Sequence, residues 1–150
     1  MKIEDYSLSK TGFTLTELLI VIAILGILIG IAVPSYLGQQ KRAARTEAYS
    51  NLQNLRLLEE QFFAENGAYT ASAANVAAIQ ALLPGFRPGT GLSFDYAITQ
   101  NVALTPPVAV PYGGATVAQT PCFVAIATGA AGSRVAGDVF AIDCNNVRNF

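Results

Sequence analysis

The sequence predicts an α+β fold in which one long N-terminal α-helix packs against a small antiparallel β-sheet. Near the N-terminus an apolar run is followed by apolar residues three and four positions apart as far as Phe62, which is the period of a helix. From Leu92 onward apolar and polar residues alternate instead, which is the period of a strand. The length of 150 residues is typical of one domain.

The composition excludes several functional classes. The chain has no histidine and two cysteines, so it lacks the residues for histidine-dependent catalysis and for zinc sites built from histidine or four thiolates. Nine basic and ten acidic residues give a formal net charge of −1, which argues against a nucleic-acid partner held by a basic surface. We therefore expect no catalytic residues, no cofactor, no metal and no specific nucleic acid.

The first half of the helix, 13–37, is predicted to span a membrane. Positions 18–33 contain no polar side chain, and there is no charge between Glu17 and Lys41. About 20 helical residues cross the hydrocarbon core of a bilayer. The run is longer than the apolar part of a secretory signal peptide, and the small residue Gly12 precedes it, so we expect the helix to be retained.

One carboxylate stands in the first turn of this helix, where a charge in the membrane is costly. Thr14 and Glu17 have the spacing of a capping box, and this is the first interpretation. In the second, cleavage after Gly12 frees the amine of Phe13, one helical turn from Glu17. That amine, or the amine of a neighbouring identical chain, then neutralises the acid, and the low dielectric of the lipid strengthens the pair.

The segment 12–36, GFTLTELLIVIAILGILIGIAVPSY, resembles the N-terminal signature of type IV prepilins. In that signature a leader ends in glycine, phenylalanine follows, an acid occupies the fifth mature position, and an apolar helix carries glycine and proline. The resemblance implies a pilin fold and a leader over 1–12. It also implies cleavage between Gly12 and Phe13 by a prepilin peptidase, and N-methylation of Phe13.

The same resemblance implies roles for further residues. Phe13, Thr14 and Glu17 would act in subunit assembly. Pro34 is expected to kink the helix, because proline removes a backbone hydrogen bond. The segment between Gly26 and Pro34, which includes Gly30, would unwind as subunits pack.

The resemblance also implies a function. The chain would be a major or minor pilin, placed in the inner membrane among lipids as a precursor. A membrane platform with an ATPase would then assemble it into a helical homo-oligomer, an extracellular pilus for adhesion, twitching motility or DNA uptake. One alternative is a pseudopilin of a type II secretion system, although the stretch AYTASAAN after Gly67 lacks the proline expected of a major pseudopilin. Another is a membrane-tethered exported enzyme or receptor domain.

Three basic residues follow the apolar run, namely Lys41, Arg42 and Arg45. By the positive-inside rule alone they would place the C-terminal side in the cytoplasm. The prepilin resemblance and the cysteines favour export instead. We expect the three charges to form an interfacial anchor at the lipid head groups.

The second half of the helix, 38–66, is predicted to be amphipathic. Its apolar face carries Ala48, Leu52, Leu55, Leu58 and Phe62. Its polar faces carry Glu47, Gln53, Arg56, Glu59 and Glu60. The helix is expected to end at Asn66 and Gly67, since glycine accepts the left-handed backbone of a C-terminal cap.

The remaining chain divides into a connector, 67–91, and a sheet region, 92–150. We expect a short helix at 72–83, and strands at 92–99, 122–128 and 138–144, with a fourth strand possible between the last two. A loop rich in proline and glycine separates the first two strands.

Cys122 and Cys144 flank the last two predicted strands. In an exported domain two cysteines most simply form one disulfide, and the alternative is two buried thiols. The prepilin resemblance implies that the disulfide bounds a surface loop. Asp138, Asp143 and Asn145 offer oxygens to Ca²⁺, but we expect these scattered side chains to face solvent instead.

Overall fold

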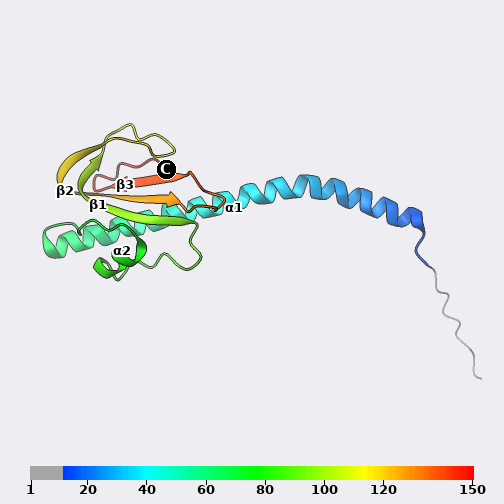
Figure 1. Cartoon of the computed structure of the whole chain (residues 1–150), viewed down its shortest axis with the longest axis horizontal. Coiled ribbons are helices and arrows are strands. Elements are labelled where there is room, and N and C mark those ends of the chain that lie inside the picture. Colours follow the sequence, from blue (N-terminus) through cyan, green and yellow to red (C-terminus); the bar gives the residue numbers. More distant parts are fainter. Residues whose placement is uncertain (1–11) are drawn as a thin grey trace, which may run out of the picture. The chain divides into compact units, whose positions relative to one another are not determined.

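The computed structural model describes residues 12–150 (Figure 1). The chain divides into two compact units: unit 1 ends at Gln39, and unit 2 runs from Gln40 to Phe150. The expected leader, 1–12, lies outside the described residues except for Gly12.

Helix α1 runs from Leu15 to Asn66 and has 52 residues. It ends where the sequence predicts, because Gly67 has a φ of 71° and its N–H donates to the carbonyl of Phe63 at 2.7 Å. Pro34 lies inside the helix without interrupting it. The kink and the unwinding expected of the segment 26–34 stay predictions.

The connector contains a shorter helix than expected. Helix α2 spans Val76–Leu82 instead of 72–83. The side chain of Asn75 accepts a hydrogen bond from the N–H of Ala78 at 2.9 Å, and this N-cap sets the start of the helix. Before the helix, Ala73 forms an isolated antiparallel bridge with Ile98, which keeps this residue out of the helix.

Three strands form one antiparallel sheet in the order β1-β2-β3: β1 is Phe94–Leu104, β2 is Thr116–Gly129 and β3 is Val139–Asp143. The predicted fold class is confirmed. The first two strands are longer than predicted, because they continue to pair beyond a bulge at Asn101, whose φ is 60°.

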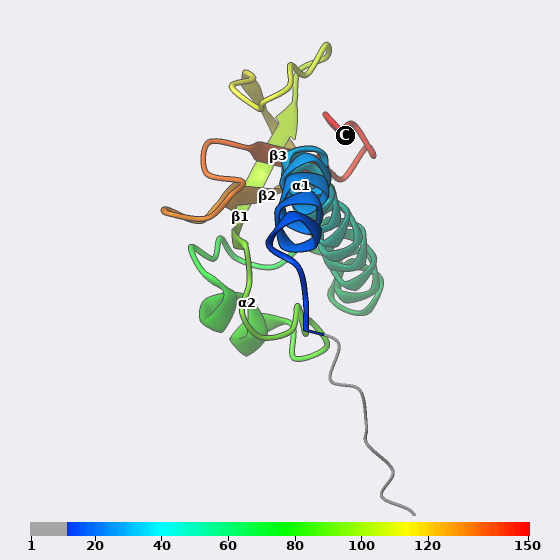
Figure 2. The same cartoon turned by 90° about the vertical axis from the view of Figure 1, so that its right-hand side faces the viewer.

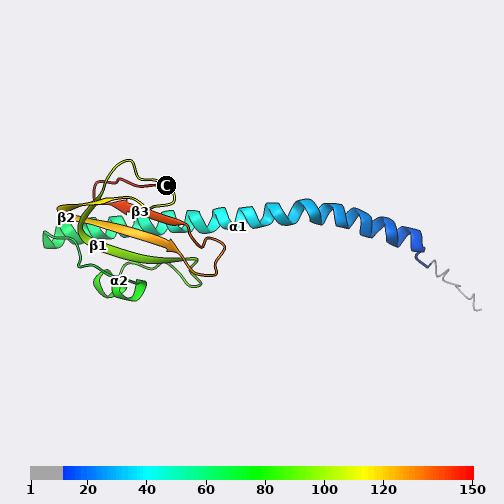
Figure 3. The ribbon, with the colours of Figure 1, turned by 45° about the horizontal axis from the view of Figure 1, so that its top comes forward.

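The main core lies between α1 and one face of the sheet in unit 2 (Figures 2 and 3). The helix contributes the fully buried residues Ala48, Leu52 and Leu55, while Leu58 and Phe62 pack against them. The amphipathic face of 38–66 is therefore confirmed. The opposite face of the sheet has a smaller core of Leu104, Val124 and Ala141.

The disulfide between Cys122 and Cys144 is present, as expected from the two cysteines. The segment that it encloses is not mainly a surface loop, because 123–143 contains half of β2 and all of β3. Only the turn at 130–138 leaves the sheet. The strands predicted between the two cysteines are therefore confirmed, and the surface loop that the resemblance implies is limited to this turn.

Candidate functional site

The predicted cleavage site lies just before α1. Gly12, Phe13 and Thr14 are exposed and precede the first helical residue, Leu15. The side chain of Phe13 is 79% exposed. The peptide bond between Gly12 and Phe13 is therefore outside the helix, where its carbonyl is not occupied by a helical hydrogen bond.

The capping box expected from the spacing of Thr14 and Glu17 is formed. The N–H of Thr14 donates to Oε2 of Glu17 at 2.9 Å, and its hydroxyl donates to the same oxygen at 2.7 Å. In return, the N–H of Glu17 donates to the hydroxyl oxygen of Thr14 at 3.2 Å. These contacts hold the carboxylate over the N-terminal end of α1, where the helix dipole also stabilises a negative charge.

The capping box also bears on the second interpretation of Glu17. The nitrogen of Phe13 is one residue before that of Thr14, so backbone geometry places it within about 6.5 Å of the carboxylate oxygen. A free amine at Phe13 would therefore lie close to the acid of its own chain. Whether this amine or that of a neighbouring copy pairs with Glu17 stays a prediction.

The rest of the helix in unit 1 is an uncovered apolar surface. Its window of highest hydropathy is long and apolar enough to cross a membrane, and none of that window is buried. The large apolar side chains between Leu18 and Leu37 are between 44% and 71% exposed. Such a surface requires lipid or other protein around it.

Two of the three basic residues at the start of unit 2 lie near an acid of the same unit. Arg45 Nε and Nη2 each donate to one carboxylate oxygen of Asp138 at 2.8 Å. Lys41 Nζ lies 3.9 Å from the same carboxylate. The turn between β2 and β3 thus brings an acid against this face of α1, and the expected anchor at the lipid head groups stays a prediction.

The prediction that Glu59 lies on a polar face of the helix is wrong. Glu59 is fully buried and accepts hydrogen bonds from the N–H and the hydroxyl of Thr70. The signal that could have found it is spacing, since Glu59 follows Leu55 by four positions on the apolar face.

The expectation that Asp138 and Asp143 face solvent is also wrong. Asp143 is fully buried, and its two oxygens accept hydrogen bonds at 2.8 to 2.9 Å from the N–H groups of Leu104, Asn145 and Val147. Both aspartates therefore have protein partners. Within 12–150 no group of three or more candidate metal ligands occurs.

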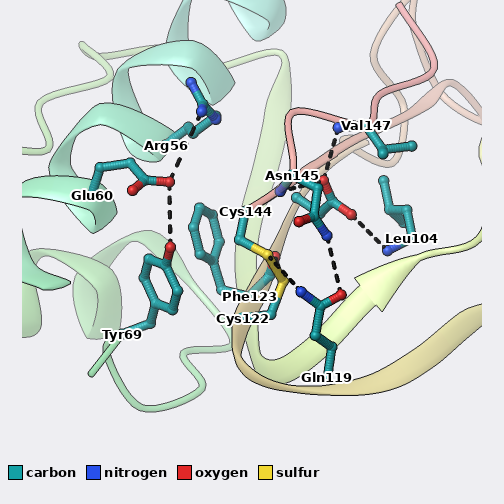
Figure 4. Close-up of a disulfide and its surroundings, with 11 residues drawn as sticks. Arg56, Glu60, Tyr69, Leu104, Gln119, Cys122, Phe123, Cys144, Asn145 and Val147 are labelled. Atoms are coloured by element: carbon teal, nitrogen blue, oxygen red, sulfur yellow. Dashed lines mark hydrogen bonds and ion pairs between the residues drawn. A yellow bond between two sulfur atoms is a disulfide. The ribbon is translucent and has the colours of Figure 1, made fainter. Parts of the chain in front are cut away.

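The disulfide joins the sheet to the segment after β3 (Figure 4). Its two Cα atoms are 5.4 Å apart, a normal spacing for the bond. Beside it, Gln119 accepts a hydrogen bond from the side chain of Asn145 at 3.1 Å. On the other side the rings of Tyr69 and Phe123 lie 4.9 Å apart. The disulfide thus lies at the edge of the core of unit 2, with Cys122 buried and Cys144 partly buried.

Comparison with known proteins supports the importance of the N-terminal segment. Residues 8–33 match the prokaryotic N-terminal methylation motif. The type IV major pilin protein PilA of Myxococcus xanthus is 34% identical over 99 residues, which cover 66% of this chain and 41% of the relative.

Two further relatives match less than half of this chain. The type IV wide pilus major component PilA4 of Thermus thermophilus is 41% identical over 63 residues, covering 42% of this chain and 48% of the relative. The type II secretion system core protein G of Pectobacterium carotovorum is 32% identical over 70 residues, covering 47% of this chain and 45% of the relative. The matches thus span less than half of each relative's length. No solved structure gives a significant match.

The methylation motif begins before the predicted cleavage site and ends within the apolar helix, and the fold behind it is a long helix packed on a small antiparallel sheet. In its N-terminal motif and in these relatives, the chain is similar to type IV pilins and to a pseudopilin of a type II secretion system.

Proposed function

We propose that this chain is a structural subunit of a type IV pilus, cut after Gly12 and assembled into a helical surface filament. The observation that carries the proposal is the apolar surface of α1 in unit 1, which is uncovered in the single chain and has one acid, Glu17, in its first turn. A filament of identical subunits covers such a surface, because the helices of neighbouring copies pack together.

The same apolar surface bears on the steps from precursor to filament. As a precursor it lies in the inner membrane with lipid around α1, and a prepilin peptidase cuts it and methylates Phe13. A membrane platform with an ATPase then moves it into an extracellular pilus. The work of the chain is assembly rather than catalysis, and the relatives' names, which describe pilus and secretion-system components, support this.

A pseudopilin of a type II secretion system is the second candidate function. The match to core protein G of Pectobacterium carotovorum favours it. The disulfide between Cys122 and Cys144 favours the pilin. Deleting the gene and assaying surface filaments and secreted proteins in parallel separates the two functions.

Intact-mass measurement of the protein purified from its own host tests the processing step. We expect a chain that begins at N-methylated Phe13. A chain that still begins at Met1 would contradict the proposal.

A substitution at Glu17 tests assembly separately. Glu17→Leu is expected to give processed, membrane-inserted protein that does not enter filaments, because the acid that pairs with an amine is lost. Glu47→Leu is the matched control, since Glu47 is an exposed acid of the same helix in unit 2. Normal filaments from Glu17→Leu would overturn its role in assembly.

A further inference from the structure

A groove lies beside the last turns of α1 in unit 2. Its volume is about 350 Å³, and its apolar lining comes from Leu58, Phe62, Leu82, Leu83 and Pro84. Exposed polar side chains of Gln61, Glu65 and Asn66 line it as well. The groove is therefore an apolar cleft with polar residues at its edge, a combination typical of binding sites.

The charge at this groove is negative. The exposed carboxylate of Glu65 accepts a hydrogen bond from the amide of Gln61 at 3.0 Å, and no ion pair forms to it within the described part of the chain. The last turn of α1 has no basic residue, so the partial negative charge of the helix C-terminus is not offset. The groove thus suits a cation that is carried on an apolar stem.

The turn between β2 and β3 carries such a cation. Arg134 is exposed within the segment GAAGSRVAG, whose other residues are small or apolar. The one acid next to this segment, Asp138, is already paired with Arg45, and residues 12–150 contain no ion pair to Arg134. An arginine buries its hydrocarbon stem on an apolar surface while its head stays polar.

The turn between β2 and β3 lies at the opposite end of unit 2 from the last turns of α1 (Figures 1 and 3), and those last turns line the groove. Arg45, beside the turn, and Glu65, at the groove, are 20 positions apart on α1, which corresponds to about 30 Å along a helix. Within one copy the two surfaces therefore do not meet. If two copies are displaced from each other along α1, the turn of one copy can lie against the groove of the other.

We propose that the groove of one copy binds the β2–β3 turn of the next copy, with the guanidinium of Arg134 against the carboxylate of Glu65 and its stem over the apolar lining. The opposite charges of the two surfaces select a second copy of this chain as the occupant. Two different surfaces of one chain that fit each other form a heterologous contact, which continues as an open filament where the rotation does not close a ring. This inference rests on the proposed filament function.

Charge reversal in the full-length protein, expressed in its own host, tests the contact. Arg134→Glu and Glu65→Arg, each alone, place like charges together and are expected to reduce surface filaments about tenfold or more. The double variant Arg134→Glu/Glu65→Arg restores opposite charges and is expected to return filaments toward the wild-type amount. Disulfide formation, read from mobility without reductant, checks that each variant folds.

Arg148→Glu is the matched control, since Arg148 is exposed and its guanidinium lies over the ring of Phe150 rather than at the turn. It is expected to leave filaments unchanged. Single variants that assemble normally, a double variant that fails to recover, or an equal loss in Arg148→Glu would each overturn the contact. If the wild-type chain formed no surface filaments, that result would count against the proposed function instead.

Discussion

The buried carboxyl group of Glu59 on α1 accepts two hydrogen bonds from Thr70, one from its backbone N–H at 3.0 Å and one from its hydroxyl. Both residues are almost completely buried. The pair fixes the first residues of the connector to the helix. Burial raises the pKa of the Glu59 carboxyl, the bonds from Thr70 oppose that rise, and the nearby charge of Glu60 adds to it.

This raised pKa predicts how stability depends on pH. The folded chain holds a proton on Glu59 that the unfolded chain releases, so the free energy of unfolding falls as pH rises from the ordinary glutamate pKa through the raised one. Glu59→Gln, which is neutral and of similar shape, should remove that fall and be more stable than the wild type at about pH 8. Thermal unfolding of the detergent-solubilised full chain over a pH series measures this pH dependence of stability.

The control for Glu59→Gln is Glu47→Gln, which neutralises an exposed acid on the same helix. It should keep the wild-type pH dependence. An unchanged pH dependence in Glu59→Gln would show that this carboxyl is not the group responsible.

The ion pair between Arg45 and Asp138 predicts a second pH effect of opposite sign. Hydrogen bonds from the Arg45 guanidinium hold the pKa of the Asp138 carboxyl below its ordinary value. The stability that the pair contributes is present above that ordinary value and is lost as pH falls through the lowered one. Asp138→Asn is expected to cost about 1 kcal/mol near neutral pH, because the pair is partly exposed.

Thermal unfolding and hydrogen exchange over 40–48 measure the effect of Asp138→Asn, with Asp95→Asn as the exposed control. We expect faster exchange in this first part of α1 in unit 2, since Asp138 ties it to the β2–β3 turn. Equal exchange rates in the two variants would contradict this role.

Substitution of Asp143 by asparagine is predicted to destabilise the protein more than the same substitution of Asp138. In Asp143→Asn an amide can keep only part of the three backbone hydrogen bonds, and an NH₂ group would replace an oxygen that now accepts from one of the donors. Leaving a buried donor unsatisfied costs about 1–3 kcal/mol. Exchange at the amides of Leu104 and Val147 should accelerate in step with a lower unfolding temperature, and a variant as stable as the wild type would refute the prediction.

Gly129 is predicted to tolerate no side chain. A Cβ at this position would overlap the carbonyl group of Val135, because the backbone closes tightly at the β2–β3 turn. Gly129→Ala is expected to cost about 1–3 kcal/mol through overpacking. Gly113→Ala is the control, since its Cβ would meet no atom within 4 Å, and similar unfolding temperatures for the two variants would contradict the prediction.

Much of the fold could be predicted because its signals are local. The end of α1 follows from Asn66 and Gly67, and the core face of the helix follows from the spacing of Ala48, Leu52 and Leu55. The extension of β1 could not be predicted, since the polar pair Gln100 and Asn101 interrupts the alternation. Only the pairing of Val102 with Ala118 beyond the bulge reveals that the strand continues.

The sequence by itself determined the apolar helix, its capped acid and the glycine before it, because these features depend on residues within a few positions of one another. Only the tertiary structure decided the partners of Glu59, Asp138 and Asp143. Thr70 lies 11 positions from Glu59, and Arg45 lies 93 positions from Asp138. Leu104 lies 39 positions from Asp143. The burial of a carboxyl group and the donors that satisfy it depend on how distant segments meet, and residue type alone does not specify that.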